Sequence, residues 1–413
     1  MRLIHTSDWH LGHTLGTFSR TLEHQAFLDW LAERLEEHGV DALLIAGDVF
    51  DSANPPASAQ GMWFAFLAAV HRRLPALQVL VVGGNHDSAA RLDAPGPVLE
   101  DLSVRVVGGV PRRDGEIAWE EMVLPLRGAS GQVEALVAAV PFLRGSDLPQ
   151  VGEDEDPLIE GTRAFYARVV TAAATRRAEG QALVGTGHCY LVGGALSSDS
   201  ERVIQRGNQA ALPADIFGPE LDYVALGHLH RPQQVGSPRL RYSGSPISLS
   251  VTERDYPHQV LLVDLDGGAL AGVTPLLFPP PVRLIRIPER GAAASEVVLA
   301  ACRELPAAGD LPRDQWPLVE LWVAQREPDL GLRAAVDQAL EGRAARLVHM
   351  RVRAEGTGAA LGDGEEAQRL EDLALEEVFR LAWTRHYADG PDEDDLMLFA
   401  ELQERVALGG GEL

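Results

Sequence analysis

The sequence contains no lysine, and all 36 of its basic residues are arginines. Without lysine it has no Walker A lysine, no Schiff base and no Ser-Lys dyad, so a P-loop ATPase step would need another chain. Cysteine occurs only twice, too few for a disulfide framework or a cysteine-rich zinc site. No apolar run reaches the ~20 residues that span a bilayer, and the N-terminus lacks the apolar core of a signal peptide. We therefore expect a cytoplasmic protein without membrane contact.

The sequence also lacks an excess of positive charge. Its 413 residues carry 36 basic and 60 acidic side chains, for a net charge of −24. This balance argues against a protein that coats nucleic acid through bulk charge, but it allows a local basic groove or carboxylates that bind metal ions. Hydrophobic residues make up 46% of the chain, which is typical of globular proteins. At ~150 residues per domain, the length predicts two or three domains.

Residues 1–230 repeat a short apolar run, a polar loop and a helical pattern. This alternation predicts an α/β fold with buried strands, whose polar loops gather at the carboxyl edge of the sheet and build the functional site. We expect strands at 3–4, 42–46, 79–82, 104–107, 116–124, 133–140, 240–242 and 259–265, strand-to-loop units at 182–188 and 223–230, and helices at 22–38, 57–74 and 158–178.

The run from Phe278 to Pro281 marks a domain boundary, because proline ends both strands and helices. Beyond it, the pattern predicts a small α+β unit with strands at 282–287, 318–323 and 347–352 and helices at 294–305 and 330–340. Residues 356–364 have the composition of a linker, and two amphipathic helices follow. We therefore expect three parts: 1–278, 279–355 and 356–413.

Side chains that bind metals occur in five loops, each directly after an apolar strand. They are Asp8 and His10, Asp48, Asn85 with His86 and Asp87, His188, and His228 with His230. Residues two apart at a strand end point the same way, so each Asp-x-His or His-x-His pair can converge. A preceding glycine allows a sharp turn and leaves room for a metal and a phosphate. Mixed Asp, Asn and His ligands without Cys favour Mn²⁺, Fe²⁺ or Zn²⁺.

Each of these loops, taken singly, has a simpler explanation. A lone Asp-x-His or Gly-His is more often a helix cap or a hydrogen-bonded polar residue, and Asn-His after a strand is typical of a turn. Five such loops in a consistent order, each at the end of an apolar strand, weaken that explanation sharply. We interpret the set as one metal-dependent active site.

The motif order D-x-H, G-D, G-N-H-D, G-H and G-H-x-H resembles that of the calcineurin-like binuclear metallophosphoesterases. Residues 5–12, 23–28, 47–51 and 242–246 are similar, more closely, to the SbcD family, the Mre-type nuclease subunits of bacterial SbcCD DNA-repair complexes. The resemblance covers residues 1 to about 250 and extends more loosely over the remainder. It implies a four-layer metallophosphoesterase sandwich, a small α+β capping domain that contacts DNA, and C-terminal helices.

The resemblance implies two divalent ions, Mn²⁺ with Mg²⁺, Fe²⁺ or Zn²⁺ as alternatives, and no nucleotide bound by this chain. The implied ligands are Asp8, His10 and His230 for the first ion, Asn85, His188 and His228 for the second, and Asp48 as the bridge. His86 matches the catalytic histidine of the family. It would neutralise charge on the phosphorane or protonate the leaving oxygen.

Several neighbouring residues keep open interpretations. Asp87 either orients His86 or shapes its turn. Asp51 stands where archaeal and eukaryotic relatives carry a histidine, so we assign it no catalytic role. We treat His13 as structural, with a site role as the alternative. The other histidines that we interpret as structural or surface residues are His5, His24, His38, His71, His258, His349 and His386.

The resemblance also implies DNA as the substrate, cleaved by a 3′→5′ double-strand exonuclease and a single-strand and hairpin endonuclease, with a nucleoid-associated location. It implies a homodimer within a heterotetramer, in which the tail helices dock onto a coiled-coil ATPase of the SbcC type. Such a partner fits the missing P-loop lysine. The arginines that could hold phosphates are at 20, 72–73, 91, 112–113, 176–177, 202, 206 and 231, although solvated surface positions are the commoner role of arginine.

Two other functions remain open. The first is a phosphomonoesterase or cyclic-nucleotide phosphodiesterase, which would keep the metals and change the substrate. Residues 47–52 lack the Asp-Arg-Gly of the protein phosphatases, and Asp87 stands where those enzymes carry Glu. The second is a non-catalytic scaffold on the same fold. The filled ligand positions disfavour it, because degenerate relatives lose ligands.

Overall fold

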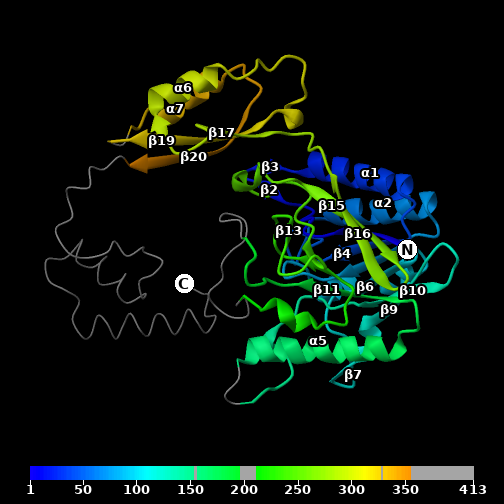
Figure 1. Cartoon of the computed structure of the whole chain (residues 1–413). Helices are drawn as coiled ribbons and strands as arrows, with labels where there is room; N and C mark the ends of the chain where they lie inside the picture. The colour runs from blue at the N-terminus through cyan, green and yellow to red at the C-terminus, as the bar shows by residue number, and fades with distance from the viewer. Residues whose placement is uncertain (153–155, 196–210, 327–328, 355–413) are drawn as a thin grey trace, which may run out of the picture. The chain divides into compact units, whose positions relative to one another are not determined.

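Two mixed β-sheets of six strands each form the larger part of the described chain (Figure 1). The computed structural model describes residues 1–152, 156–195, 211–326 and 329–354. In spatial order, the first sheet contains β16 (Ala269–Leu277), β15 (Gln259–Asp266), β1 (Arg2–Thr6), β4 (Ala42–Ala46), β5 (Gln78–Val82) and β6 (Val104–Val107). Strands β1, β4, β5 and β6 are parallel, so their carboxyl ends lie at one edge.

The second sheet also contains four neighbouring parallel strands. In spatial order it contains β13 (Gln233–Gln234), β14 (Leu240–Tyr242), β12 (Tyr223–Gly227), β11 (Ala182–His188), β10 (Val133–Ala138) and β9 (Val123–Arg127). The four inner strands are parallel, and the two edge strands are antiparallel to their neighbours.

The alternating side chains of β4 explain the layers. Ala42, Leu44 and Ala46 pack in the core between the two sheets. Leu43 and Ile45 point the other way and pack with α1 (Thr21–Glu37) and α2 (Ala57–Arg73). Helix α5 (Pro157–Arg176) covers the outer face of the second sheet (Figure 1). This four-layer sandwich confirms the predicted fold class.

A third sheet, with all its strand pairings parallel, lies within residues 284–354. Its strands are β17 (Leu284–Ile287), β18 (Ala293–Ala294), β19 (Leu318–Gln325) and β20 (Arg346–Ala354), and its helices are α6 (Ser295–Arg303) and α7 (Leu332–Leu340). Val298, Val319 and Val336 pack in a separate core between this sheet and the helices. The tail helices expected within 356–413 lie outside the described residues.

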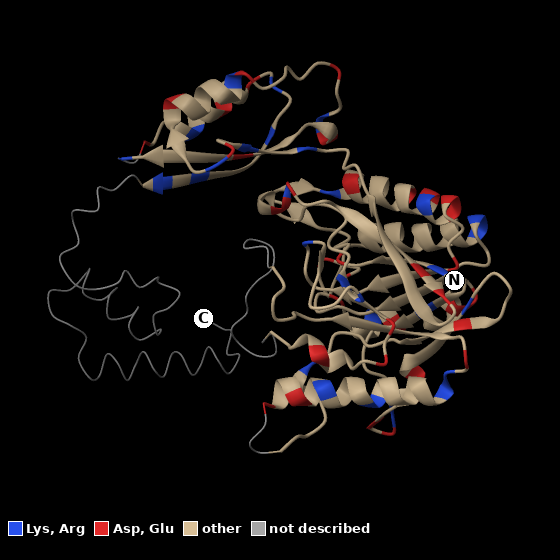
Figure 2. Cartoon of the chain, viewed as in Figure 1, with Lys and Arg blue, Asp and Glu red and all other residues tan. Residues whose placement is uncertain are grey.

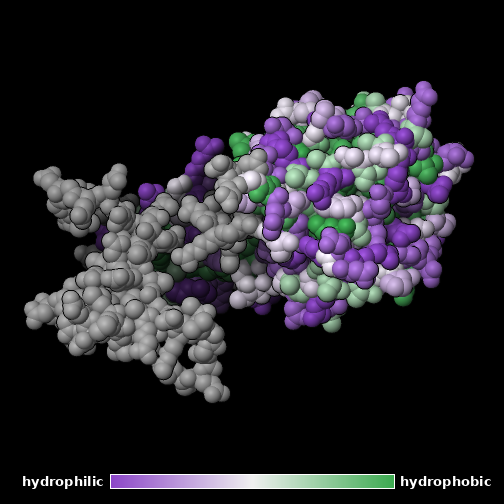
Figure 3. Space-filling view, turned by 90° about the horizontal axis from the view of Figure 1, so that it is seen from below, coloured by the Kyte–Doolittle hydropathy of each residue, from purple (hydrophilic) through white to green (hydrophobic). Residues whose placement is uncertain are grey.

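Short elements connect the layers. They are β2 (Thr14–Leu15), β3 (Phe18–Ser19), α3 (Ala89–Asp93), α4 (Gly96–Glu100), β7 (Arg112–Arg113), β8 (Glu116–Ile117), η1 (Trp119–Met122), η2 (Gly145–Asp147), η3 (Ala214–Phe217), η4 (Val251–Glu253) and η5 (Arg313–Gln315). In the described part of the chain no helix has the length and apolar character to cross a bilayer. On the face in Figure 3, hydrophobic residues occupy small areas among hydrophilic ones.

Two sequence predictions of strands are wrong. The strand expected at 116–124 is interrupted by the 3₁₀ turn η1, which places Trp119 against Phe165 of α5, with ring centroids 4.9 Å apart. The edge strand β16 was not expected at all, and its residues are half-buried or exposed and include Gly272 and Pro275. Packing against α5 decides the first case. Pairing with β15 decides the second, because Gly272 and Pro275 have weak strand preference of their own.

His5 of β1 is a fully buried imidazole. Its Nδ1 accepts a hydrogen bond from the Tyr223 hydroxyl at 2.8 Å, so its Nε2–H donates to the Leu226 carbonyl at 3.2 Å. Burial lowers the pKa of His5 from 6.5 to about 3, because the charged form loses its hydration. His5 is therefore a neutral core residue, in agreement with its expected structural role.

We predict that His5 makes the fold acid-sensitive. Below pH 6.5 the unfolded chain takes up a proton at this residue and the folded chain does not, so stability falls as the pH decreases toward 3. The slope contributed by one histidine is at most ~1.4 kcal/mol per pH unit. Urea unfolding between pH 7 and 4 should show a shallower slope for His5→Asn than for the wild type. His38→Asn, at the end of α1, is the matched control, and equal slopes for all three proteins would contradict the prediction.

Candidate metal centre

The predicted metal-binding side chains lie at the carboxyl ends of five strands. The first sheet contributes Asp8 and His10 after β1, Asp48 after β4, and Asn85 after β5; the second contributes His188 at the end of β11 and His228 and His230 after β12. The oxygen ligands therefore all come from one sheet, and three of the four imidazoles come from the other. A centre built from these residues requires both sheets.

The ligand atoms of these residues converge. Three groups have ligand atoms within 4.8 Å of one another: Asp8, His10 and His230; His10, Asp48 and His86; and Asp8, Asp48 and His188. Asn85 Oδ1 lies 2.9 Å from His188 Nε2 and 3.0 Å from His228 Nδ1. The structure thus brings together all seven residues expected as ligands, with His86 beside them.

Four of the seven have a left-handed backbone, which non-glycine residues avoid. The φ angles are 54° for Asp8, 47° for His10, 50° for Asp48 and 95° for His228. Strand β1 ends at Thr6 and β12 at Gly227, before the ligands begin. The pairs therefore converge through strained loops, and the sequence argument from strand alternation was wrong. Such residues cost about 1–3 kcal/mol each and cluster at functional sites.

The glycines before the ligands allow both a sharp turn and a close approach; Gly47 has a φ of 93°, as the predicted turn requires. A Cβ on Gly47 would lie 2.2 Å from His188 Nδ1, and one on Gly84 would lie 2.2 Å from Asp48 Oδ1. These glycines make room for the side chains of other ligands. Glycine is required at both positions because any side chain would displace a ligand.

His10 shows that the residues fit a metal ion. It is 2% exposed, yet neither ring nitrogen makes an aligned hydrogen bond. Its Nδ1 lies 3.2 Å from Asp51 Oδ1 and its Nε2 lies 3.6 Å from Asp48 Oδ2, close enough for attraction but without hydrogen-bond geometry. A buried polar atom without a partner is destabilising, and a cation held by imidazole and carboxylate would satisfy it.

Asp48 is the buried anionic centre of the site. Burial alone would raise its pKa, but the charge and hydrogen bond of His188, with His10 and His86, hold the pKa below 3.8. Burial would lower the pKa of His188, and the Asp48 charge instead raises it to about 9. Asp48 is therefore ionised at neutral pH, as a bridging ligand must be.

Backbone and carboxylate partners orient the imidazoles. His188 Nδ1–H donates to the Ala46 carbonyl at 2.9 Å, and His230 Nδ1–H donates to Glu253 Oε1 at 2.9 Å. Each bond orients its ring and leaves Nε2 to face the centre. Glu253 is fully buried, and its Oε2 accepts a hydrogen bond from the Leu249 amide at 2.7 Å.

Asp51 and His13 form a similar pair. His13 Nδ1 lies 2.9 Å from Asp51 Oδ1, and His13 Nε2 lies 2.9 Å from the Leu249 carbonyl. The same Asp51 oxygen approaches His10. Burial would raise the pKa of Asp51, but its contacts with His10 and His13 hold it below its ordinary value. His13 therefore acts through Asp51, at one remove from the ligands.

Asp87 is a turn residue. Its carboxylate accepts hydrogen bonds from the amides of Gly84 at 2.9 Å, Val49 at 3.1 Å and Phe50 at 3.0 Å. These bonds tie the Asp48 loop to the Asn85 loop. Burial, followed by the Asp48 charge, raises the pKa of Asp87 to about 6. Its hydrogen bonds within the described residues all go to backbone amides, which favours turn formation over the alternative of orienting His86.

Comparisons with known proteins agree with this geometry. The profile of the calcineurin-like phosphoesterases matches residues 1–232. A Rhodobacter capsulatus protein named as the SbcD component of nuclease SbcCD is 43% identical over 356 residues, which cover 85% of this chain and 87% of that protein. The chain belongs to the calcineurin-like phosphoesterase family.

Further relatives extend the match across bacteria. Proteins with the same name from Escherichia coli K12 and Bacillus subtilis are 38% identical over 287 residues and 34% identical over 273 residues. These matches cover 68% of both chains for E. coli, and 65% of this chain and 67% of the relative for B. subtilis. Residues 280–387 match the type 5 capsule protein repressor C-terminal domain. As a phosphoesterase of this family, the chain is a hydrolase of phosphodiester bonds with a binuclear site for divalent metals.

Glu253 was missed by the sequence analysis, because nothing in its local sequence connects it with His230, 23 residues away. We predict that Glu253→Gln lowers Mn²⁺ affinity about 10–100-fold, since the imidazole loses the carboxylate that orients it. Calorimetric titration of the metal-free chain with Mn²⁺ measures the effect. Glu289→Gln, at an exposed position, is the control. Equal affinities for both variants would show that Glu253 does not act on the centre.

Proposed function

We propose that this chain is the nuclease component of an SbcCD-type complex for DNA repair and recombination, and that it uses Mn²⁺. Its activities would be a 3′→5′ exonuclease on double strands and an endonuclease on single strands and hairpins. One observation carries the proposal: seven ligand side chains and His86 converge at one end of the two sheets, in a chain whose relatives are named as the SbcD component of nuclease SbcCD.

We assign the ligands by position. Asp8, His10 and His230 hold one ion, Asn85, His188 and His228 hold the other, and Asp48 lies between the two groups. When bound, two divalent ions supply Lewis-acid activation of water and of the attacked phosphate. The Ala46 carbonyl and Glu253 keep the imidazoles of His188 and His230 turned toward the centre.

His86 is positioned to handle a proton. Its backbone amide donates to Asp48 Oδ1 at 2.8 Å, which fixes the residue beside the bridging carboxylate. Its Nδ1–H donates to the Asp51 carbonyl at 2.9 Å, so Nε2 is the nitrogen that exchanges a proton. The exposed side chain can reach a phosphate at the site, and a protonated Nε2 would stabilise or protonate the leaving oxygen.

Two arginines that come shortly after ligand loops in the sequence are suited to grip DNA. Figure 2 shows basic and acidic residues intermixed on the surface helices, and Arg73, Arg113 and Arg176 have carboxylate partners. Arg20 is 1% exposed and pairs with Glu23, so it cannot touch a phosphate. In the described part of the chain Arg91 and Arg231 have no ion pair, and they follow the Asn85 and His230 loops directly. We propose them as phosphate contacts.

The remaining parts of the chain complete the proposal. We assign 1–278 as the nuclease domain and 279–355 as a capping domain that contacts DNA. We assign 356–413 as a linker and helices that dock onto an SbcC-type coiled-coil ATPase. The name that the relatives share supports that partner, as does a chain without lysine. We further propose a homodimer within a heterotetramer, in association with the nucleoid.

The proposed activity predicts Mn²⁺-dependent shortening of an end-labelled duplex by the purified chain, which EDTA abolishes. Asp48→Ala should remove cleavage, because the bridging carboxylate is lost. Asp101→Ala, at an exposed position, is the control. Turnover of a phosphomonoester or a cyclic nucleotide in the absence of DNA cleavage would favour the alternative phosphatase function.

His86→Gln should remove cleavage, a loss on the order of 10²–10⁴-fold for a proton-transfer group, and leave Mn²⁺ binding intact. Cleavage assays paired with calorimetric Mn²⁺ titration test both parts. Parallel loss of metal and activity would instead make His86 a ligand or a residue required for folding.

Deletion of 366–413 should abolish co-purification with the ATPase partner and spare the basal Mn²⁺ nuclease, because the proposed ligands all precede that segment. Pull-down of the two co-expressed chains, with and without the deletion, measures the first effect. A truncated chain that still binds the ATPase would exclude the tail as the docking segment.

A further inference from the structure

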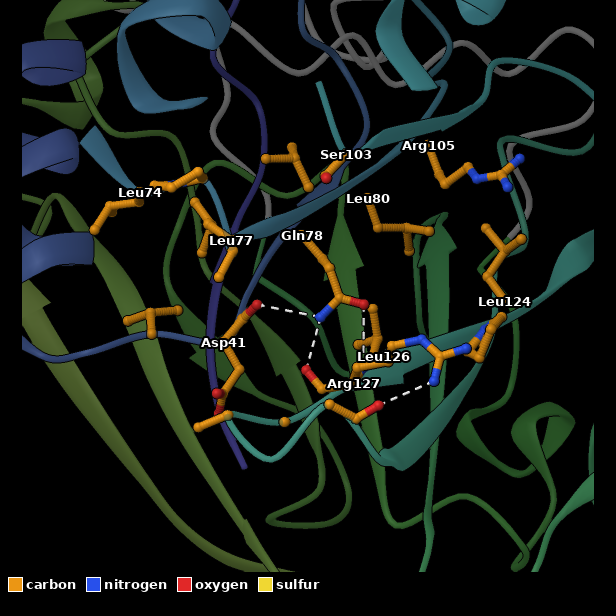
Figure 4. Close-up of a pocket in the computed structure, with 18 of the residues that line it drawn as sticks. Asp41, Leu74, Leu77, Gln78, Leu80, Ser103, Arg105, Leu124, Leu126 and Arg127 are labelled. Atoms are coloured by element: carbon orange, nitrogen blue, oxygen red, sulfur yellow. Dashed lines mark hydrogen bonds between the residues drawn. The ribbon is translucent and has the colours of Figure 1, made fainter. Parts of the chain in front are cut away.

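A cavity of about 820 Å³ opens at the amino ends of β4 and β5, the ends opposite the metal centre (Figure 4). Asp41, one residue before β4, lines it, and Asp48 lies beyond the other end of that strand. At ~3.3 Å per residue the two positions are roughly 20 Å apart. The cavity is therefore separate from the metal centre, and its function is independent of the proposed nuclease.

The walls of the cavity are largely apolar. Leucines from β5, from β9 and from the loop between α2 and β5 line it, namely Leu74, Leu77, Leu80, Leu124 and Leu126. Leu77, Leu80 and Leu126 are buried, whereas Leu74 and Leu124 are half-buried and form the approach. A space of this volume with an aliphatic lining matches the sites that enclose drug-sized ligands, which lie between about 300 and 1,000 Å³.

The Gln78 amide and one carboxylate oxygen of Asp41 already have hydrogen-bond partners. Gln78 Oε1 accepts from the Arg127 amide at 3.0 Å, and its Nε2 donates to the Arg127 carbonyl at 2.7 Å. Asp41 Oδ2 accepts from the Arg2 amide at 2.7 Å. A polar ligand body would find few partners here and would lose its hydration, so the interior selects an apolar one.

Three exposed arginines line the cavity. Arg73, Arg105 and Arg127 line it, against the single acidic residue Asp41. Arg73 and Arg105 pair with the carboxylates of Glu36 and Glu100. Arg127 is exposed, and Nη1 donates to the Gly131 carbonyl at 3.0 Å. No carboxylate pairs with Arg127 within the ranges that the structure describes, so its charge is available to a ligand.

The charged residues around the cavity also determine how an anionic ligand would lie in it. Figure 4 shows Asp41 on one side of the cavity and Arg105 on the other, with Leu77, Gln78 and Leu80 between them. An anionic group is repelled by Asp41 and attracted by Arg105 and Arg127. We propose that this cavity binds a small organic anion, with an apolar body against the leucines and a carboxylate, sulfonate or phosphate at Arg127.

Two fluorescent probes that differ in charge test the proposal on the full chain. 8-Anilinonaphthalene-1-sulfonate has an apolar body with one anionic group, and N-phenyl-1-naphthylamine has the same body without it. We expect saturable binding of the sulfonate at one site. Arg127→Gln should weaken it about tenfold and leave the affinity for the neutral probe unchanged, because charge-assisted hydrogen bonds are the strong ones. Arg72→Gln, an exposed neighbour outside the cavity, should change neither affinity.

A second variant locates the binding site. Ala76 lines the cavity at an exposed position, so Ala76→Trp fills the space without entering the core. It should abolish saturable binding of both probes, with an unchanged unfolding midpoint to show that the chain is folded. The proposal is overturned if the wild type binds neither probe, if Ala76→Trp binds both as tightly as the wild type, or if Arg127→Gln affects the two probes equally.

Discussion

The hydrogen bond from the His228 amide to Asp8 Oδ1, 2.9 Å long, joins the two sheets at their carboxyl ends. Nearby, the Ala46 carbonyl of the first sheet accepts from His188 of the second, and a Cβ on Gly227 would lie 2.0 Å from that carbonyl oxygen. The two sheets are therefore in direct contact where the ligands lie. Since each sheet supplies only part of the donor set, the metal centre exists only while this junction is intact.

The junction is destabilising in itself. It buries the carboxylates of Asp8 and Asp48 and holds four side-chain-bearing residues in left-handed conformations. Hydrophobic packing must offset this, and the core between the sheets lies directly beneath the loops, with Ala46 and Ala138 both fully buried. Bound cations would also stabilise the junction, because they would neutralise the charge of Asp48 and give the His10 nitrogens a ligand partner. The fold thus holds ready a site whose charge favours the binding of divalent metals.

The sequence predicts the structure correctly where a run of residues has a single physical explanation. The all-apolar run of β4 predicts a buried strand, and metal-type side chains directly after such runs predict a shared site. It does not predict the role of a residue when that role depends on a contact with a residue far away in the chain. Glu253 and Asp51 act through His230 and His10, and no local pattern marks these contacts. The 3₁₀ turn at Trp119 likewise depends on packing against α5. Left-handed ligands such as His10 follow from the surrounding hydrogen bonds and not from residue preference.

Strand β4 shows why the two ends of the sandwich are fixed relative to each other. Every residue from Ala42 to Ala46 is buried, and alternate side chains enter different cores. A slip of one residue would exchange Leu44 with Leu43 and Ile45, so both cores would lose their packing at once. The strand can therefore neither slide nor rotate within the folded protein. The packing of β4 therefore sets the backbone that leads to Asp48 at one end of the strand and to Asp41, which lines the distant cavity, at the other.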